Sequence, residues 1–240
     1  MPGPRQVIPR PPKTAPGGPA PWASLPPEAR RGIRLEALLA ALDAHRHALA
    51  GSERIAFDDL PGGGSPAAVL VPLFEEGTET HVVLTRRAGH LRTHTGEVSF
   101  PGGRLHAGED PEVGACREAQ EEVGLDPTSV KVVGELTALA TFSSGATITP
   151  VVGVLAARPE LEPNPQEVEH VFDVALAVLL SDGVFREERW YMPGRPLLSA
   201  KLGDGEPGWF PMWFFDLGED VIWGATARML VELLRLAVGV

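Results

Sequence analysis

The sequence predicts an α/β protein in which helices cover both faces of a mixed β-sheet. Short β-branched and aliphatic runs lie on both sides of a strongly acidic helical segment, and an apolar helical segment closes the chain. Strands before and after a central helix favour a layered α/β/α sandwich. At 240 residues the chain is long enough to bury a sizeable core, and one domain with a tail is the simplest division.

The N-terminal segment, residues 1–27, differs in composition from the rest of the chain. It holds ten of the 24 prolines, three basic residues and no acidic residue, and it shows no helical or strand periodicity. Such a composition predicts a disordered or polyproline-like tail. We therefore expect a single domain over residues 28–240, which begins with an amphipathic helix over residues 28–50.

The remaining elements follow from periodicity and turn signals. Alternating or β-branched runs predict strands, apolar residues at three- and four-residue steps predict helices, and segments rich in glycine and proline predict loops. The expected strands cover residues 67–74, 81–84, 130–140, 148–155, 184–192 and 209–217, and the expected helices cover residues 111–123, 167–180 and 221–236.

The helix over residues 111–123 has the clearest boundaries. Pro111 suits the first turn of a helix, where a missing N–H costs nothing, and Asp110 before it is a suitable N-cap. Gly124 is a suitable stop. With Glu118 placed at 0° on a helical wheel, Glu121 falls at about 300° and Glu122 at about 40°, so three carboxylates share one face. The opposite side, which we expect to be buried, holds Val113, Cys116 and Val123.

Like charges three and four residues apart on a helix repel, which costs an isolated helix roughly 0.3 kcal/mol per pair. A divalent cation would offset this repulsion, because Mg²⁺ and Mn²⁺ prefer carboxylate oxygens and substrate phosphates. The alternative is a solvated acidic face, which is the usual meaning of a charge run.

A longer pattern favours the metal. Gly103 is followed after five residues by Glu109 and, after seven more, by the run Arg117–Leu125, REAQEEVGL. This pattern resembles the Nudix box, G-x5-E-x7-R-E-U-x-E-E-x-G-U, where U is aliphatic, and every fixed position matches. The resemblance implies the Nudix fold, an α/β/α sandwich around a mixed sheet, and metal-dependent hydrolysis of a nucleoside diphosphate linked to another group.

The resemblance also implies roles for particular residues. Glu118, Glu121 and Glu122 would bind Mg²⁺ or Mn²⁺ and act in catalysis, and the backbone carbonyl of Gly103 would be a further ligand. Glu109 and Arg117 would brace the loop against the helix. One of the three metal-binding glutamates, or Glu167 or Glu169 outside the box, would accept the proton of the attacking water.

A second pattern precedes the box and shares its register. The run Leu84–Ala88 reads LTRRA, and it is followed by Arg92, Gly96 and the run Phe100–Gly103, FPGG. This pattern resembles the signature of coenzyme A pyrophosphatases within the Nudix family, L-L-T-x-R-(S/A)-x3-R-x3-G-x3-F-P-G-G. Val83 replaces the first leucine.

Coenzyme A carries a diphosphate and a ribose 3′-phosphate, and arginine is well suited to bind phosphate oxygens. The pattern therefore predicts that Arg87 and Arg92 bind substrate. Arg86, His90 and His94 are weaker candidates, because a basic residue near a strand end is often only a solvated surface group.

Composition excludes some other functions. The formal net charge of −11 argues against a nucleic-acid-binding protein. Cys116 is the only cysteine, which excludes an internal disulfide and a cysteine-based zinc site. The sequence shows no signal peptide and no run of about 18 apolar residues, so we expect a cytoplasmic protein without a membrane span. The aromatic residues near Trp213 suit the core or a homodimer surface.

The sequence thus predicts hydrolysis of coenzyme A or its thioesters to 3′-phosphoadenosine 5′-phosphate and 4′-phosphopantetheine or its acyl derivative. One alternative is a Nudix pyrophosphatase of ADP-ribose, NADH or another nucleoside diphosphate derivative. Another is a catalytically silent Nudix domain that binds a ligand or a partner. The intact carboxylate set argues against the silent domain.

Overall fold

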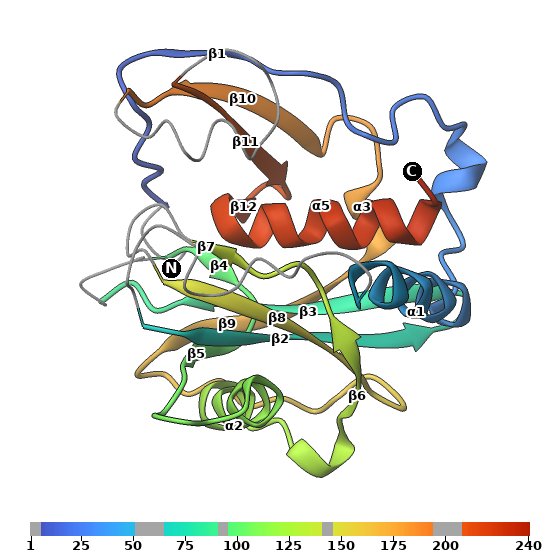
Figure 1. Cartoon of the computed structure of the whole chain (residues 1–240), viewed down its shortest axis with the longest axis vertical. Coiled ribbons are helices and arrows are strands. Elements are labelled where there is room, and N and C mark those ends of the chain that lie inside the picture. The colour runs from blue at the N-terminus through green and yellow to red at the C-terminus, as the bar shows by residue number, and fades with distance from the viewer. Residues whose placement is uncertain (1–5, 51–64, 91–95, 141–145, 194–207) are drawn as a thin grey trace.

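The computed structural model describes residues 6–50, 65–90, 96–140, 146–193 and 208–240. A large mixed sheet is covered by helix α2 on one face and by helices α1 and α5 on the other, and a smaller sheet packs on the far side of α5 (Figure 1). The helices are α1 (Leu35–Ala50), α2 (Pro111–Val123), α3 (Leu176–Leu179) and α5 (Gly224–Val238), with 3-10 turns η1 (Pro27–Arg30) and η3 (Pro127–Ser129).

The large sheet has the strand order β4-β3-β2-β8-β6. Strand β5 pairs with β2, β7 pairs with β8, and β9 pairs with β3. The pair β2–β8 is parallel and the others are antiparallel, so the predicted mixed α/β sheet is confirmed. Its strands are β2 (Ala67–Glu76), β3 (Glu79–Arg87), β4 (Val98–Ser99), β5 (Gly102–Arg104), β6 (Lys131–Glu135), β7 (Leu139–Ala140), β8 (Thr147–Val154) and β9 (Val168–Ala175).

Two apolar cores lie on the two faces of this sheet. Alternate residues of a strand point to opposite faces, so Val82 and Leu84 of β3 pack toward α5, whereas Val83 packs toward α2. The core under α2 is the smaller one. It includes Ala115 and Ala119 of the helix itself, whose short side chains let α2 lie close to the sheet.

The smaller sheet has the order β1-β10-β11-β12 and consists of β1 (Thr14–Pro16), β10 (Phe185–Tyr191), β11 (Trp209–Asp216) and β12 (Val221–Trp223). The two strands expected near residues 184–192 and 209–217 are confirmed, and the structure pairs them antiparallel. Phe210, Phe214 and Phe215 are fully buried, which assigns these aromatic residues to the core.

The structure differs from the expected disordered tail over residues 6–27. Strand β1 pairs with β10, and Trp22 is 1% exposed and packs against Phe185 and Phe215. Lys13 adds a cation–π contact, 4.7 Å from the ring centre of Tyr191. Prolines are compatible with such an edge strand because it pairs on one side only. Composition therefore misled the prediction, because strand pairing and the burial of Trp22 anchor the segment.

The expected helix over residues 28–50 begins later, at Leu35. The chain first forms the short turn η1, and Gly32 then adopts a left-handed backbone with φ of +62°. This conformation interrupts a right-handed helix. The backbone N–H groups of Gly32, Ile33 and Leu35 instead donate to the carboxylates of Glu79 and Glu75 on the sheet.

The expected helix over residues 167–180 is wrong for most of its length. Residues Val168–Ala175 form strand β9, which pairs antiparallel with β3, and only the four residues of α3 are helical. The run VEHVFDVA is rich in β-branched and aromatic residues, which favour a strand. The exposed edge of β3 supplies a partner for it, which the sequence alone did not reveal.

The last expected helix is confirmed from Gly224 onward, whereas residues Val221–Trp223 before it form β12. Within the described part of the chain, no helix is both long and apolar enough to cross a membrane.

Candidate functional site

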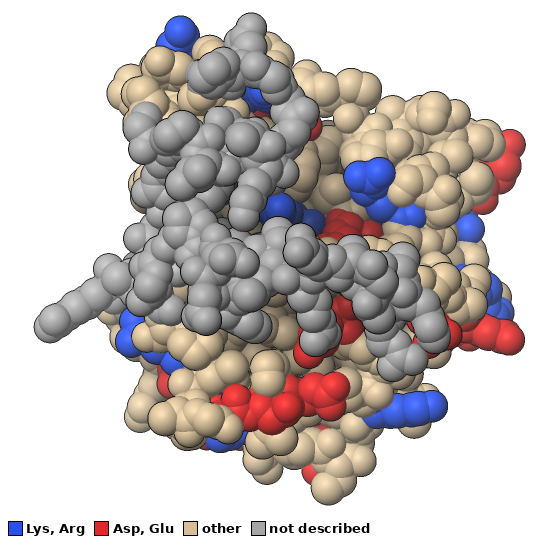
Figure 2. Space-filling model, in the orientation of Figure 1, with Lys and Arg blue, Asp and Glu red and all other residues tan. Residues whose placement is uncertain are grey.

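Helix α2 has the predicted ends. The carboxylate of Asp110 accepts a hydrogen bond from the Glu112 N–H at 2.9 Å, and Gly124 ends the helix in the left-handed conformation with φ of +68°. Acidic side chains gather on the surface over α2 (Figure 2). The loop from β5 and this helix together carry the whole acidic motif.

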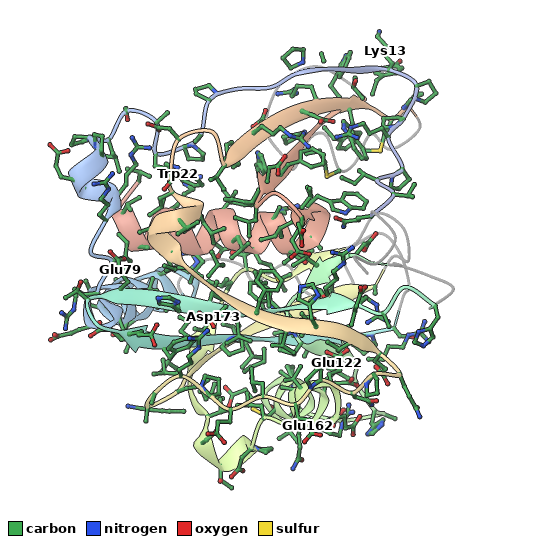
Figure 3. All side chains as sticks on the ribbon, turned by 180° about the vertical axis from the view of Figure 1, so that it is seen from behind. Lys13, Trp22, Glu79, Glu122, Glu162 and Asp173 are labelled. Carbon is green, nitrogen blue, oxygen red and sulfur yellow. The ribbon has the colours of Figure 1, made fainter. Side chains whose placement is uncertain are left out.

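The prediction of which face of α2 is buried was wrong in part. Val113 is 60% exposed, whereas Ala115, Ala119 and Glu122 are buried. On the helical wheel these three residues fall at about 60°, 100° and 40°, so the buried arc is centred on the alanines. A consequence is that Glu122 lies inside this arc, at the interface between α2 and the sheet (Figure 3).

Glu109 and Arg117 form the brace that the motif predicts. The guanidinium donates twice to the Glu109 carboxylate, from Nε at 2.8 Å and from Nη2 at 3.0 Å. The His106 N–H donates to the same carboxylate at 2.8 Å, and Arg117 Nη2 also donates to the Arg104 carbonyl. Hydrogen bonds from Arg117 and from this backbone N–H lower the pKa of Glu109 to about 2.

Gly103 brings the backbone of β5 against the helix. A Cβ atom added at this glycine would lie 2.5 Å from Glu118 Oε2, which is too close for any real side chain. The glycine therefore lets the β5 backbone and the Glu118 carboxylate touch. This juxtaposition places the predicted backbone ligand next to a predicted carboxylate ligand.

Glu122 is the buried member of the carboxylate set and is 3% exposed. Its Oε2 accepts the Gly102 N–H at 3.1 Å, and its Oε1 lies 3.7 Å from Arg87 Nη1. Burial raises the pKa of Glu122 to about 7, and the neighbouring carboxylates of Glu167 and Glu118 contribute to the rise. The Gly102 donor was not predicted, although the FPGG run placed a glycine there.

The other two carboxylates turn toward the brace. Arg117 Nη1 donates to Glu118 Oε1 at 2.9 Å and to Glu121 Oε2 at 3.3 Å. Among the residues that the structure describes, no three His, Cys, Asp or Glu side chains are arranged around one cation position.

The chemistry of the donor set nevertheless fits a hard divalent cation. It offers several carboxylate oxygens, one of them desolvated beside other carboxylates, and such a cluster is relieved by a cation. Binding a cation would require Glu118 and Glu121 to share their oxygens between Arg117 and the metal.

The structure separates the remaining candidates. Arg87 faces Glu122, and Glu167 lies near enough to influence the pKa of that carboxyl. The Glu167 carbonyl also accepts the Ala88 N–H at 2.8 Å, which fixes it beside the end of β3. Arg86 is buried on the opposite face of β3, where it pairs with Asp220 at 3.2 Å.

Glu169 lies at the edge of the sheet, where its carboxylate is 3.6 Å from Arg86 Nε, so it is not brought to the carboxylate cluster. His90 is exposed. Arg92 and His94 lie outside the described residues.

Comparison with known proteins places this site in a family. The NUDIX domain model matches residues 64–192. The chain is 39% identical over 176 residues to "Nudix hydrolase 15, mitochondrial" of Arabidopsis thaliana, a match that covers 69% of this chain and 56% of that protein. It is 36% identical over 168 residues to the "Uncharacterized Nudix hydrolase NudL" of Pectobacterium atrosepticum, covering 70% of this chain and 80% of NudL.

The matched region thus spans about half the length of the plant relative and most of the bacterial one. Among solved structures, a MutT/nudix family protein from Enterococcus faecalis aligns with a TM-score of 0.46 and 15% identity, over 86% of this chain and 71% of that chain. The extent of the family match and the similarity to NudL lead to one conclusion: the chain belongs to the Nudix hydrolase family.

Proposed function

We propose that this protein is a metal-dependent pyrophosphohydrolase that cleaves the diphosphate of coenzyme A or its thioesters. The observation that carries the proposal is the position of Arg87. The coenzyme A-type pattern ends in the Nudix box, and Arg87 of that pattern lies 3.7 Å from Glu122 of the box. A substrate phosphate held by the arginine would therefore lie beside the carboxylates.

The residues of the chain divide the work as follows. Glu118, Glu121, Glu122 and the Gly103 carbonyl would hold Mg²⁺ or Mn²⁺, which when bound polarises the phosphoryl oxygen and acidifies water. Arg87 would bind a phosphate oxygen and balance the charge that develops there. Arg117 and Glu109 would hold the loop and the helix in register, so that the carboxylates keep their positions.

A proton acceptor for the attacking water is available on either side of the cluster. Glu122 is a candidate inside the box: burial raises its pKa to about 7, and a bound cation would lower that pKa and favour the carboxylate form. Glu167 is the candidate outside the box, because it lies near Glu122 and Glu169 does not. Glu167→Gln and Glu169→Gln form a matched pair. A large loss of kcat in the first alone would assign the base to Glu167.

The direct test is a comparison of substrates. The purified protein is incubated with Mg²⁺ or Mn²⁺ and, in parallel, with coenzyme A, dephospho-coenzyme A, ADP-ribose and NADH, and the products are separated by chromatography. We expect 3′-phosphoadenosine 5′-phosphate to form fastest, and removal of the 3′-phosphate to lower kcat/KM. Faster turnover of ADP-ribose or NADH would mean that the protein hydrolyses a diphosphate other than that of coenzyme A. No turnover of any of these compounds would favour a ligand-binding module.

A further inference from the structure

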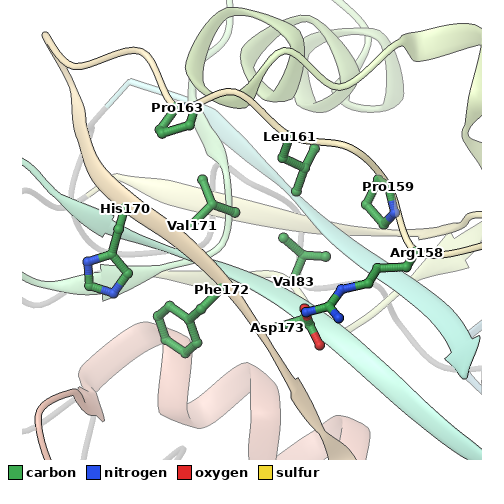
Figure 4. A pocket seen from close by; sticks show the side chains of 9 residues that line it. All are labelled: Val83, Arg158, Pro159, Leu161, Pro163, His170, Val171, Phe172 and Asp173. Carbon is green, nitrogen blue, oxygen red and sulfur yellow. The ribbon is translucent and has the colours of Figure 1, made fainter.

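A groove of about 310 Å³ lies beside strand β9 (Figure 4). We refer to it as the β9 groove. One wall is the strand itself, including Val171 and Asp173, and the other wall is the segment Arg158–Pro163. Val83 of β3 lines it as well, and this volume is within the range of sites that bind small molecules.

The groove and the proposed site share one face of the sheet. Residues 83, 85 and 87 of β3 point to the same side because side chains alternate along a strand. Val83 and Val171 both pack into the core under α2. Val83, the residue of β3 that lines the groove, is therefore four residues from Arg87, or about 13 Å along the strand.

The outer wall of the groove is attached to the catalytic helix. The Asn164 N–H donates to the Glu122 carbonyl at 2.8 Å, and the Glu162 N–H donates to the Val123 carbonyl at 3.0 Å. Pro163 lies between these two anchors and lines the groove. One end of the groove is thus next to the backbone of Glu122, and the other end is at the ion pair between Arg158 and Asp173.

The lining suits an extended, uncharged chain that carries amides. Val83, Leu161, Pro163 and Val171 supply apolar contacts. The charged side chains of the lining, Arg158 and Asp173, pair with each other, and Asp173 also contacts His81 at 2.8 Å, so their charges are balanced within the groove. Among the strands that the structure describes, only β3 pairs with β9, so the backbone groups on the other edge of β9 have no strand partner. A free strand edge binds extended amide-containing chains through backbone hydrogen bonds.

We propose that the β9 groove binds the pantetheine arm of the substrate while the diphosphate lies at Arg87 and the carboxylates. The arm is extended, uncharged and carries two amides, and it is joined directly to the diphosphate. This inference rests on the proposed function. It assigns the arm, rather than the nucleotide, to Val171, Leu161 and the edge of β9.

The assignment is tested with a substitution that fills the β9 groove. Val171→Trp places a bulky side chain in it, and Val178→Trp, at a residue that is 45% exposed on α3 and is not part of the lining, is the matched control. We expect Val171→Trp to lower kcat/KM for coenzyme A at least tenfold, mainly through KM. The inhibition constant of 3′-phosphoadenosine 5′-phosphate, which lacks the arm, should stay unchanged. The control variant should match the wild type in both measurements.

The outcomes separate the two proposals. If the wild type cleaves coenzyme A and a folded Val171→Trp variant has unchanged kinetics, the groove assignment is overturned and the proposed function stands. If KM and the inhibition constant rise together, the effect is general and the assignment is again overturned. If the wild type does not cleave coenzyme A, the proposed function fails and this inference fails with it.

A labelling experiment covers the case in which Val171→Trp does not fold. Wild-type protein is irradiated with coenzyme A that carries a photoreactive diazirine on its sulfur, and the labelled peptide is identified by mass spectrometry. We expect the label within residues 158–173, and competition by unmodified coenzyme A. A label that is confined to other segments would overturn the assignment.

Discussion

Glu109 and Glu122 are the first and last glutamates of one motif, and their environments shift their pKa values in opposite directions. Glu109 accepts two hydrogen bonds from Arg117 and one from a backbone N–H, and its pKa falls to about 2. Glu122 is buried with one backbone donor and a more distant arginine, and its pKa rises to about 7.

The difference between these two pKa values shows that one motif can use two glutamates for separate tasks. A carboxylate that stays ionised in a tight pair with arginine holds the structure in place. A carboxylate that is desolvated near other carboxylates binds a cation or a proton readily, which is typical of functional sites. We therefore expect Glu109 to hold the structure in place, and we expect Glu122 to take part in the chemistry.

The largest expected effect is the loss of turnover when the Glu122 carboxyl group is replaced by an amide. Glu122→Gln keeps the shape of the side chain but removes a proposed metal ligand and candidate base, so we expect kcat to fall by about 10²- to 10⁴-fold. Steady-state kinetics with saturating Mg²⁺ measure this, and circular dichroism checks the fold. Glu112→Gln, an exposed carboxylate on the same helix, is the control. Near-normal turnover in Glu122→Gln would remove α2 as the catalytic element.

A smaller loss is expected when the brace is weakened. Arg117→Lys keeps the charge but removes the double hydrogen bond to Glu109 and the contacts to Glu118 and Glu121. Residues that orient metal ligands typically affect activity by about 10- to 100-fold. We expect a loss of this size together with a lower Tm, whereas Arg104→Lys, at an exposed arginine, should change neither. Unchanged Tm and activity would show that the brace has no structural role.

Gly103→Ala tests the contact between β5 and Glu118. The added methyl would lie 2.5 Å from the carboxylate, and the flexible end of Glu118 would have to move. We expect a roughly tenfold loss in kcat/KM, because small displacements of catalytic groups are costly. Apparent affinity for Mn²⁺ should weaken as well. Gly18→Ala is the control, because an added Cβ there meets no atom within 4 Å. An equal effect of both substitutions would contradict the contact.

The smallest expected effect is on stability as a function of pH. The pKa of Glu122 rises from its ordinary value of 4.5 to about 7, so between these values the folded protein holds a proton that the unfolded chain releases. The free energy of unfolding should therefore fall by about 3 kcal/mol as pH rises through this window. Glu109 acts in the opposite direction, because its contribution is lost as pH falls from 4.5 toward 2.

Urea unfolding of the wild type and Glu122→Gln, in the presence of a chelator, separates the two contributions. The difference in unfolding free energy between the proteins should change between pH 5 and pH 8 and stay constant at higher pH. A difference that is independent of pH over this range would mean that Glu122 is not desolvated.

The elements of the chain differ in how well the sequence predicts them. The boundaries of α2 and the two strands expected near residues 67–74 and 81–84 are confirmed, because local capping residues and turns determine them. For the residues of strand β9 the sequence predicts a helix, and for Trp22 it predicts a disordered tail. In both cases a distant partner decided the outcome: strand β3 for β9, and the small sheet for Trp22.

By itself, the sequence determined the family, the spacing of the acidic motif and the ends of the helix that carries it, since each depends on residues that are close along the chain. Only the tertiary structure decided which carboxylate of that helix is buried, because packing of Ala115 and Ala119 against the sheet sets the rotation of α2. It also decided that Glu167, and not Glu169, approaches the cluster. Burial and distance depend on contacts between segments far apart in sequence, and these contacts set the pKa values on which the proposed chemistry depends.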